Sequence, residues 1–152
     1  MQQIETPIKH RTLSYETELM KTEQRDGIVR SVGKPGIRIS SPPEFKGKEG
    51  LWTPEHFFVA ALDSCLMMTF LALAARNSLI VKEYNSQATG VLESENGVFS
   101  FTKVTLEPVV IVERIEEFEK AKGLLEEAHN RCFVANSVRS EVLMNPSIRW
   151  IP

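Results

Sequence analysis

The stretch FFVAALDSCLMMTFLALAA, residues Phe57 to Ala75, decides the fold of this chain. Its 19 residues are mostly apolar, and by count alone they are long enough to cross a bilayer. Asp63 stands near the middle, however, and a carboxylate at the centre of a bilayer costs at least ~2.5 kcal/mol. We therefore expect no membrane span but a helix that protein buries on nearly all sides. Such burial needs more partner surface than one small domain supplies.

The neighbouring residues define the two ends of this helix. Thr53 is suited to cap it, Pro54 fits the first helical position, and Glu55 lies at the positive end of the helix dipole. The helix is predicted to run to about Arg76, with Asn77 as the stop.

Strands are predicted before the helix. A period-2 pattern runs through residues 12–24, and Asp26-Gly27 is a tight-turn pair that leads into a second strand. A third short strand is predicted over residues 36–40. The segment 44–50 is charged and contains glycine, which predicts a loop.

Four elements are predicted after the helix: strands over residues 84–93 and 98–112, a helix over 113–131 and a strand over 139–144. Asn96-Gly97 is a strong signal for a hairpin turn between the first two. The resulting order, βββ-α-ββ-α-β, predicts a single α+β domain over residues 1–152 with mainly antiparallel strand pairs.

Composition and charge exclude several classes of function. The chain of 152 residues has 18 basic and 20 acidic residues. Its net charge of −2 lacks the excess of positive charge that is typical of nucleic-acid-binding proteins. Two cysteines cannot form a disulfide-dense secreted scaffold. Residues 1–7 lack the cationic and apolar regions of a signal peptide. We expect a cytoplasmic protein, in which free thiols are the rule.

The two cysteines are the candidates for chemistry. Cys65 lies inside the apolar helix, and Cys132 continues the apolar face of the second helix. A buried free cysteine commonly acts as a small hydrophobic side chain. Packing of the two helices would nevertheless bring these two thiols together.

A reactive cysteine must be a thiolate. Cys65 is twelve residues past Thr53, too far to feel the helix dipole, and burial favours the neutral thiol. We therefore expect a cation to reach it. The candidates are Arg25, Arg30, Arg38 and Arg76.

Arg25 stands in a turn, from which it can project into a neighbouring pocket, and Glu55 could orient it through a bidentate ion pair. On one straight helix Glu55 and Cys65 are about 15 Å apart along the axis and ~80° apart around it. Either the helix breaks between them, or Glu55 serves the Cys65 of a second subunit. His129 and Cys132 lack the accompanying pairs of a metal site, and none is expected.

Three segments together resemble the OsmC/Ohr family. They are TPEHFFVAALDSC at residues 53–65, CFVANSV at residues 132–138 and the turn RDG at residues 25–27. The resemblance extends over about residues 12–150, and the three motifs occur in order at family-like distances.

The resemblance implies an OsmC-like fold, in which antiparallel sheets wrap long central helices in an intertwined homodimer. It also implies a thiol-dependent peroxidase for organic hydroperoxides. Cys65 would be the peroxidatic thiolate and Cys132 the resolving cysteine, while Arg25 would hold the thiolate and polarise the peroxide, and Glu55 would hold Arg25. The Cys65–Cys132 disulfide would be reduced by an external small thiol or by dihydrolipoyl groups, as in parts of the family, with no bound cofactor.

The chain departs from the family pattern at three places. Phe133 stands where many members have proline, the run Leu62-Asp63-Ser64 replaces a small neutral run, and Trp52 occupies a position that is often small. Asp63 is expected to point about 160° away from Cys65. A non-redox small-molecule-binding or stress-associated module on the same fold would explain these departures. A hot-dog acyl-thioesterase is a third reading, which the strand order and cysteine spacing oppose.

Overall fold

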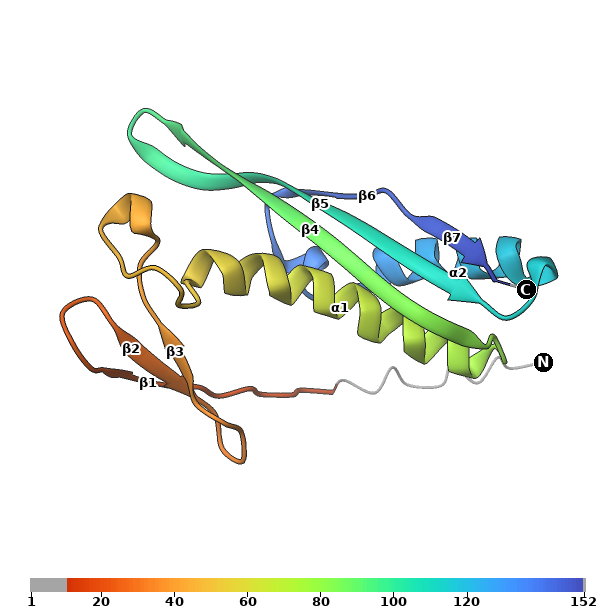
Figure 1. The fold of residues 1–152 in the computed structure, drawn as a ribbon, viewed down its shortest axis with the longest axis horizontal. Helices are drawn as coiled ribbons and strands as arrows, with labels where there is room; N and C mark the ends of the chain where they lie inside the picture. The colour runs from red at the N-terminus through yellow and green to blue at the C-terminus, as the bar shows by residue number, and fades with distance from the viewer. Residues whose placement is uncertain (1–10, 152) are drawn as a thin grey trace, which may run out of the picture. The chain divides into compact units, whose positions relative to one another are not determined.

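The computed structural model describes residues 11–151, and the chain divides into two compact units, Met1–Pro54 and Glu55–Pro152. The first unit contains a three-stranded antiparallel sheet in the order β1-β2-β3 (Figure 1). Its strands are β1 (Glu18–Lys21), β2 (Gly27–Arg30) and β3 (Ile37–Ile39). The expectation of one domain over residues 1–152 stays a prediction.

The first strand is shorter than predicted, and its turn lies slightly earlier. The backbone reverses over residues 22–26, where Thr22 N–H donates to the Asp26 carbonyl at 3.0 Å and Gln24 has a φ of 34°. Gly27 therefore begins β2, opposite Lys21, rather than completing the turn. The predicted loop contains one short 3-10 helix, η1 (Pro43–Phe45), and then returns so that Trp52 bridges Ile39.

The second unit contains two α-helices and a four-stranded sheet (Figure 1). Its elements are α1 (Pro54–Arg76), β4 (Val81–Glu95), β5 (Val98–Val112), η2 (Ile115–Glu117), α2 (Phe118–Arg131), η3 (Ala135–Ser137), β6 (Glu141–Met144) and β7 (Ser147–Trp150). The end of α1 is as predicted. The predicted second helix is divided into η2 and α2.

β4 and β5 form a long hairpin of two 15-residue strands. Asn96 and Gly97 both have positive φ, 52° and 78°, as a type I′ turn requires. The prediction of a hairpin at this dipeptide is confirmed, and the first strand is longer than predicted at both ends.

The sheet of the second unit is mixed, although antiparallel pairs predominate among the described strands, as predicted. β6 and β7 both pair parallel to β5, and α2 lies in the crossover that parallel pairing needs. β7 was not predicted, because Pro146 marks a strand end in the sequence. In the structure that proline only interrupts the strand, since the preceding Asn145 still donates its N–H to the Leu106 carbonyl at 2.9 Å.

One core joins β5 to both helices. The fully buried residues of β5 follow a period of two, so they share one face of the sheet, and they cluster with the apolar faces of α1 and α2. The principal members are Leu62, Leu66, Phe70, Val104, Leu106, Val110, Val112, Ala121, Leu125 and Ala128.

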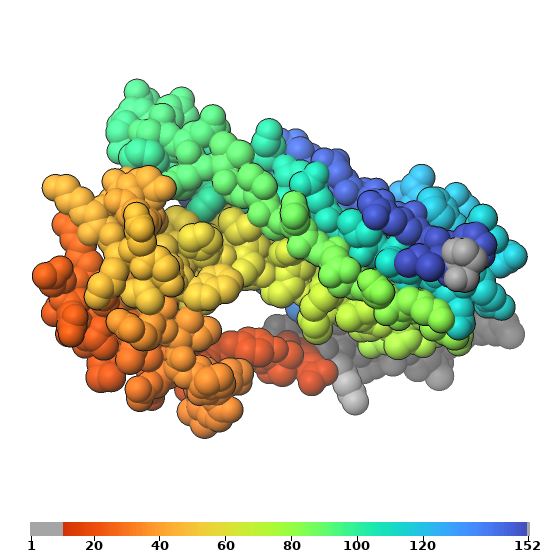
Figure 2. Space-filling view, viewed as in Figure 1, coloured from red at the N-terminus to blue at the C-terminus, as the bar shows by residue number. Residues whose placement is uncertain are grey.

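The central helix is less buried in this single chain than predicted. By length and composition α1 could cross a membrane. Only 28% of its apolar 18-residue stretch is buried within this chain. Its opposite face carries Met68, 56% exposed, together with exposed Ala72 and Ala75. Figure 2 shows part of α1, in yellow, at the surface beside β4, in green. One chain therefore covers one face of this helix.

Candidate thiol site

The two thiols meet inside the second unit. Cys65 lies midway along α1, and Cys132 is the residue at which α2 ends. Both are free, and the Cys132 thiol hydrogen-bonds to the sulfur of Cys65. The prediction that the packed helices bring the two cysteines together is confirmed.

Hydrogen bonds stabilise the thiolate form of Cys65. Burial is the largest single influence and opposes ionisation, but donors outweigh it and hold the pKa of Cys65 below its usual value. These donors are the Cys132 thiol, the backbone of Val134, the Thr69 hydroxyl and the backbone of Phe133. Of the two thiols, Cys65 is therefore the one that ionises more readily.

The backbone donors arise from the way in which α2 ends. Cys132 leaves the helical conformation with a φ of −66° and a ψ of 115°, and the chain then turns into η3. Phe133 and Val134 lie beyond the end of α2, so helical hydrogen bonds do not occupy their N–H groups. These groups therefore donate to the sulfur of Cys65.

Cys132 has the opposite character. Burial, followed by its hydrogen bond to Cys65, raises the pKa of Cys132 to about 11. The Ala135 N–H also contacts its sulfur at 3.4 Å. Only 1% of Cys132 is exposed. The pair is thus asymmetric, with a thiolate-prone Cys65 beside a Cys132 that keeps its proton.

This arrangement differs from the sequence argument in one respect. We expected a cation to offset burial at Cys65; neutral donors from the same unit already do so, and the role of a cation stays a prediction. The sequence reasoning missed Thr69, although its position four residues after Cys65 places the two on neighbouring turns of one helix face.

A pocket opens beside Cys65. Its volume is about 390 Å³, within the range of small-molecule sites. It is lined by Cys65, Met68, Thr69, Ala72, Leu73, Arg76, Arg131 and Phe133. Asp63 faces elsewhere, as expected, because its carboxylate accepts a hydrogen bond of 2.6 Å from Ser86 on β4.

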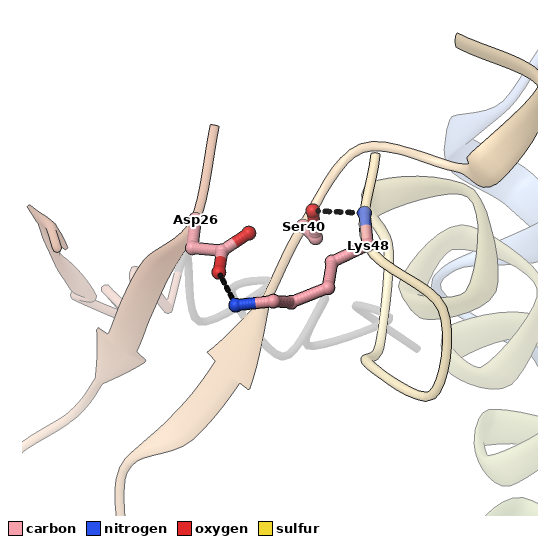
Figure 3. A network of polar contacts seen from close by, with 3 residues as sticks. All are labelled: Asp26, Ser40 and Lys48. Atoms are coloured by element: carbon pink, nitrogen blue, oxygen red, sulfur yellow. Dashed lines mark hydrogen bonds and ion pairs between the residues drawn. The ribbon is translucent and has the colours of Figure 1, made fainter. Parts of the chain in front are cut away.

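Arg25 lies in the first unit. Its Nη1 donates to the Phe45 carbonyl at 2.7 Å, and it lines a pocket of about 350 Å³. Beside it, Lys48 pairs with the buried Asp26 at 3.2 Å, and the Lys48 N–H donates to the Ser40 hydroxyl (Figure 3). The hydrogen bond from Ser40, aided by Lys48 and opposed by burial, lowers the pKa of Asp26.

Glu55 lies in the first turn of α1, and that helix is unbroken to Arg76. Of the two alternatives for bringing Glu55 to a Cys65, a break between them within one chain is therefore excluded. Glu55 Oε2 is buried and has no hydrogen-bond partner among residues 11–151. Across the same residues no group of three potential ligands is arranged to hold a metal ion.

Comparison with known proteins gives consistent matches. The family model described as OsmC-like protein matches residues 47–147. The structure of an OsmC-like protein of unknown function from Vibrio cholerae has a TM-score of 0.81 and 28% identity, covering 89% of this chain and 99% of that one. The structure of an organic hydroperoxide resistance protein from Elizabethkingia anophelis has a TM-score of 0.71 and 22% identity, and the match covers 95% of this chain and 100% of that one. Uncharacterized protein YmaD of Bacillus subtilis is 22% identical over 107 residues, 68% of this chain and 71% of that protein.

Proposed function

The chain belongs to the OsmC-like family, and on that premise we propose that it is a thiol-dependent peroxidase that reduces organic hydroperoxides. One observation carries the proposal: two free thiols in hydrogen-bond contact, one with a lowered and one with a raised pKa, beside an open pocket. The likeness to an organic hydroperoxide resistance protein supports the choice of substrate.

The first chemical step takes place at Cys65. Its thiolate attacks the terminal oxygen of the hydroperoxide, the O–O bond breaks, and the alkoxide leaves as an alcohol after gaining one proton. Cys65 becomes a sulfenic acid. The hydrogen bonds that stabilise the thiolate raise the fraction of Cys65 that is ready to react at neutral pH.

The second step uses Cys132. Its sulfur attacks the Cys65 sulfenic acid, its proton leaves with the hydroxyl group as water, and a disulfide forms. Because the two sulfurs already share a hydrogen bond, little rearrangement of the helices is needed. An external dithiol then supplies two electrons and two protons and restores both thiols.

The proposed roles of Arg25 and Glu55 rest on the match of these two residues to the family motifs. Arg25 polarises the hydroperoxide and holds the Cys65 thiolate, and Glu55 holds Arg25 through a bidentate ion pair. The buried Glu55 Oε2, which has no partner among residues 11–151, supports such a role because a buried carboxylate oxygen is costly without a donor.

The proposed assembly is a homodimer in the cytoplasm. The exposed apolar face of α1 around Met68 and Ala72 supports pairing with a second copy, because large exposed apolar patches mark interaction sites. A second copy would also supply the burial that the sequence of this helix demands.

Intact mass spectrometry after one equivalent of cumene hydroperoxide tests the proposal. We expect wild type to lose about 2 Da per chain by disulfide formation, and Cys132→Ser to gain about 16 Da as a sulfenic acid. Cys65→Ser should stay unchanged and consume no peroxide. Unchanged wild-type thiols, or full peroxide consumption by Cys65→Ser, would refute the peroxidase and favour a non-redox binding module.

A further inference from the structure

The turn that carries Arg25 also carries a carboxylate that can capture its guanidinium group. Asp26 follows Arg25 directly, and both residues line the same pocket of about 350 Å³. On the basis of the proposed function, we propose that Lys48 is a positioning residue, which pairs with Asp26 and thereby leaves Arg25 available for the hydroperoxide. In this role Lys48 acts through its neighbours and does not contact the reacting atoms.

Asp26 is a buried carboxylate and therefore needs a cation close by. Only 8% of its side chain is exposed, and Lys48 Nζ lies 3.2 Å from its Oδ2. A buried charge without a partner is costly, whereas the exposed Glu23, which lines the same pocket, keeps its hydration. Asp26 is therefore the carboxylate of this turn that would draw Arg25 towards itself if Lys48 were absent.

The backbone around Lys48 holds this residue beside Asp26. The Lys48 N–H donates to the Ser40 hydroxyl oxygen at 3.0 Å (Figure 3), and the Ser40 hydroxyl hydrogen-bonds to the Asp26 carboxylate. Gly47 packs tightly, because an added Cβ would lie 1.5 Å from the carbonyl oxygen of Ser41. The segment that carries Lys48 thus lies directly against the segment that carries Ser40, and the place of the lysine is fixed by backbone contacts.

Arg25 has no carboxylate partner in this arrangement. Its Nη1 donates to the Phe45 carbonyl at 2.7 Å, which occupies one of the five N–H donors of a guanidinium group. None of the ion pairs found within residues 11–151 involves Arg25. A neutral carbonyl orients the side chain without cancelling its charge, so the other donors can serve an anionic or polarised oxygen.

A purely structural ion pair is the competing explanation. If Lys48 only ties its loop to the turn, loss of either partner breaks the same contact and has the same effect on activity. If Lys48 instead restrains Asp26, loss of Lys48 is harmful and removal of the Asp26 charge is not. The two roles therefore predict different results for Asp26→Asn, alone and in combination with a Lys48 variant.

The experiment measures kcat/KM for cumene hydroperoxide and the pH profile of Cys65 alkylation. We expect Lys48→Met to lower kcat/KM roughly fivefold and to move alkylation of Cys65 to higher pH, because Arg25 then pairs with Asp26. Asp26→Asn should stay within about twofold of wild type, and adding it to Lys48→Met should restore most of the lost activity. Lys48→Arg keeps the charge and should retain activity.

Lys46→Met is the matched control and should stay within about twofold of wild type. It removes a lysine from the same loop and the same pocket, and Lys46 makes no ion pair with another residue of the range 11–151. Equal losses in Lys48→Met and Asp26→Asn, or no rescue in the double variant, would overturn the inference. Wild-type kcat/KM in Arg25→Gln would overturn it as well.

These outcomes are separate from the test of the peroxidase proposal. That proposal fails if Cys65→Ser retains full peroxide consumption, whatever the Lys48 variants do. Alkylation of Cys65 needs no peroxide, so its pH profile still decides whether Lys48 acts on the thiol through Arg25. All rates are compared at a temperature at which thermal unfolding shows every variant to be folded, so that lost stability does not imitate lost positioning.

Discussion

The thiol of Cys132 donates a hydrogen bond to the sulfur of Cys65, and this one contact moves the two pKa values in opposite directions. It lowers the pKa of Cys65, because a donor stabilises the thiolate, and it adds to the burial that raises the pKa of Cys132 to about 11. The two sulfurs therefore differ in how readily they ionise.

The first prediction concerns the order in which the thiols react. At neutral pH Cys65 should be alkylated by iodoacetamide well before Cys132, since its thiolate fraction is larger. Cys132→Ala removes the donor and should slow alkylation of Cys65 by up to about tenfold, whereas Cys132→Ser keeps a hydroxyl donor and should slow it less. Peptide mapping after timed alkylation measures both rates. Faster labelling of Cys132 would contradict the assignment of roles.

The second prediction isolates Thr69. Thr69→Val is nearly isosteric but removes the hydroxyl that hydrogen-bonds to Cys65, so the pKa of Cys65 should rise. Alkylation of Cys65 at neutral pH should slow by roughly three- to tenfold, and the rates should converge above the pKa. Thr69→Ser keeps the hydroxyl and serves as the control. Identical pH profiles for the valine variant and wild type would show that the hydroxyl does not support the thiolate.

The sequence could predict the meeting of the two cysteines, because each extends an apolar helix face and such faces pack together. It could not predict the backbone donors at Phe133 and Val134. Backbone N–H groups have no residue-type signature, and their direction depends on the local turn after α2. Side-chain types alone therefore predicted a cation at Cys65, which stays a prediction, and could not reveal these neutral donors.

The fold was predictable where one local signal decides the outcome. Thr53-Pro54-Glu55 identifies the start of α1, and Asn96-Gly97 fixes the hairpin. β7 was not predictable, because its pairing with β5 is a long-range contact that lies beyond a proline. The predicted burial of α1 is greater than the burial seen in a single chain. Apolar composition indicates how much of a helix surface avoids water, but not whether the same chain covers that surface.

The third prediction concerns the packing of α1 on the hairpin. A Cβ added at Gly90 would lie 2.6 Å from a methyl carbon of Val59 and 2.8 Å from the ring of Phe101, which stacks on Phe58 at 4.6 Å. Val59 is β-branched and the ring is held by its partner, so neither moves easily. Gly90→Ala should lower the free energy of unfolding by about 1–3 kcal/mol in urea denaturation.

Gly123 is the matched control for that substitution. It lies in α2, and a Cβ there meets nothing within 4 Å. Gly123→Ala should raise the free energy of unfolding by about 0.5–1 kcal/mol, because alanine favours the helix. A Gly90→Ala protein as stable as wild type would show that α1 can shift away from β4 at little cost.

The last prediction concerns Tyr84, on the face of β4 that meets α1. Burial, followed by the negative charge of Asp63, raises the pKa of Tyr84. The nearby Ser86 hydroxyl donates its hydrogen to Asp63, and the Tyr84 hydroxyl has no hydrogen bond of good geometry among residues 11–151. Tyr84→Phe keeps the ring that packs against Phe70 and should stabilise the protein by about 1 kcal/mol at pH 7.

The pH dependence of stability gives this prediction a definite sign. Because the folded-state pKa of Tyr84 lies above its ordinary value near 10, the hydroxyl is neutral in both the folded and the unfolded chain below pH 10, and its ionisation then costs no stability. Above pH 10 the unfolded chain ionises more readily than the folded one, so wild type loses stability as the pH rises. Urea denaturation of wild type and Tyr84→Phe at pH 7 and above pH 10 should therefore show the advantage of the variant growing with pH. An advantage that stays constant or shrinks would mean that the Tyr84 hydroxyl ionises as readily in the folded chain as in the unfolded one.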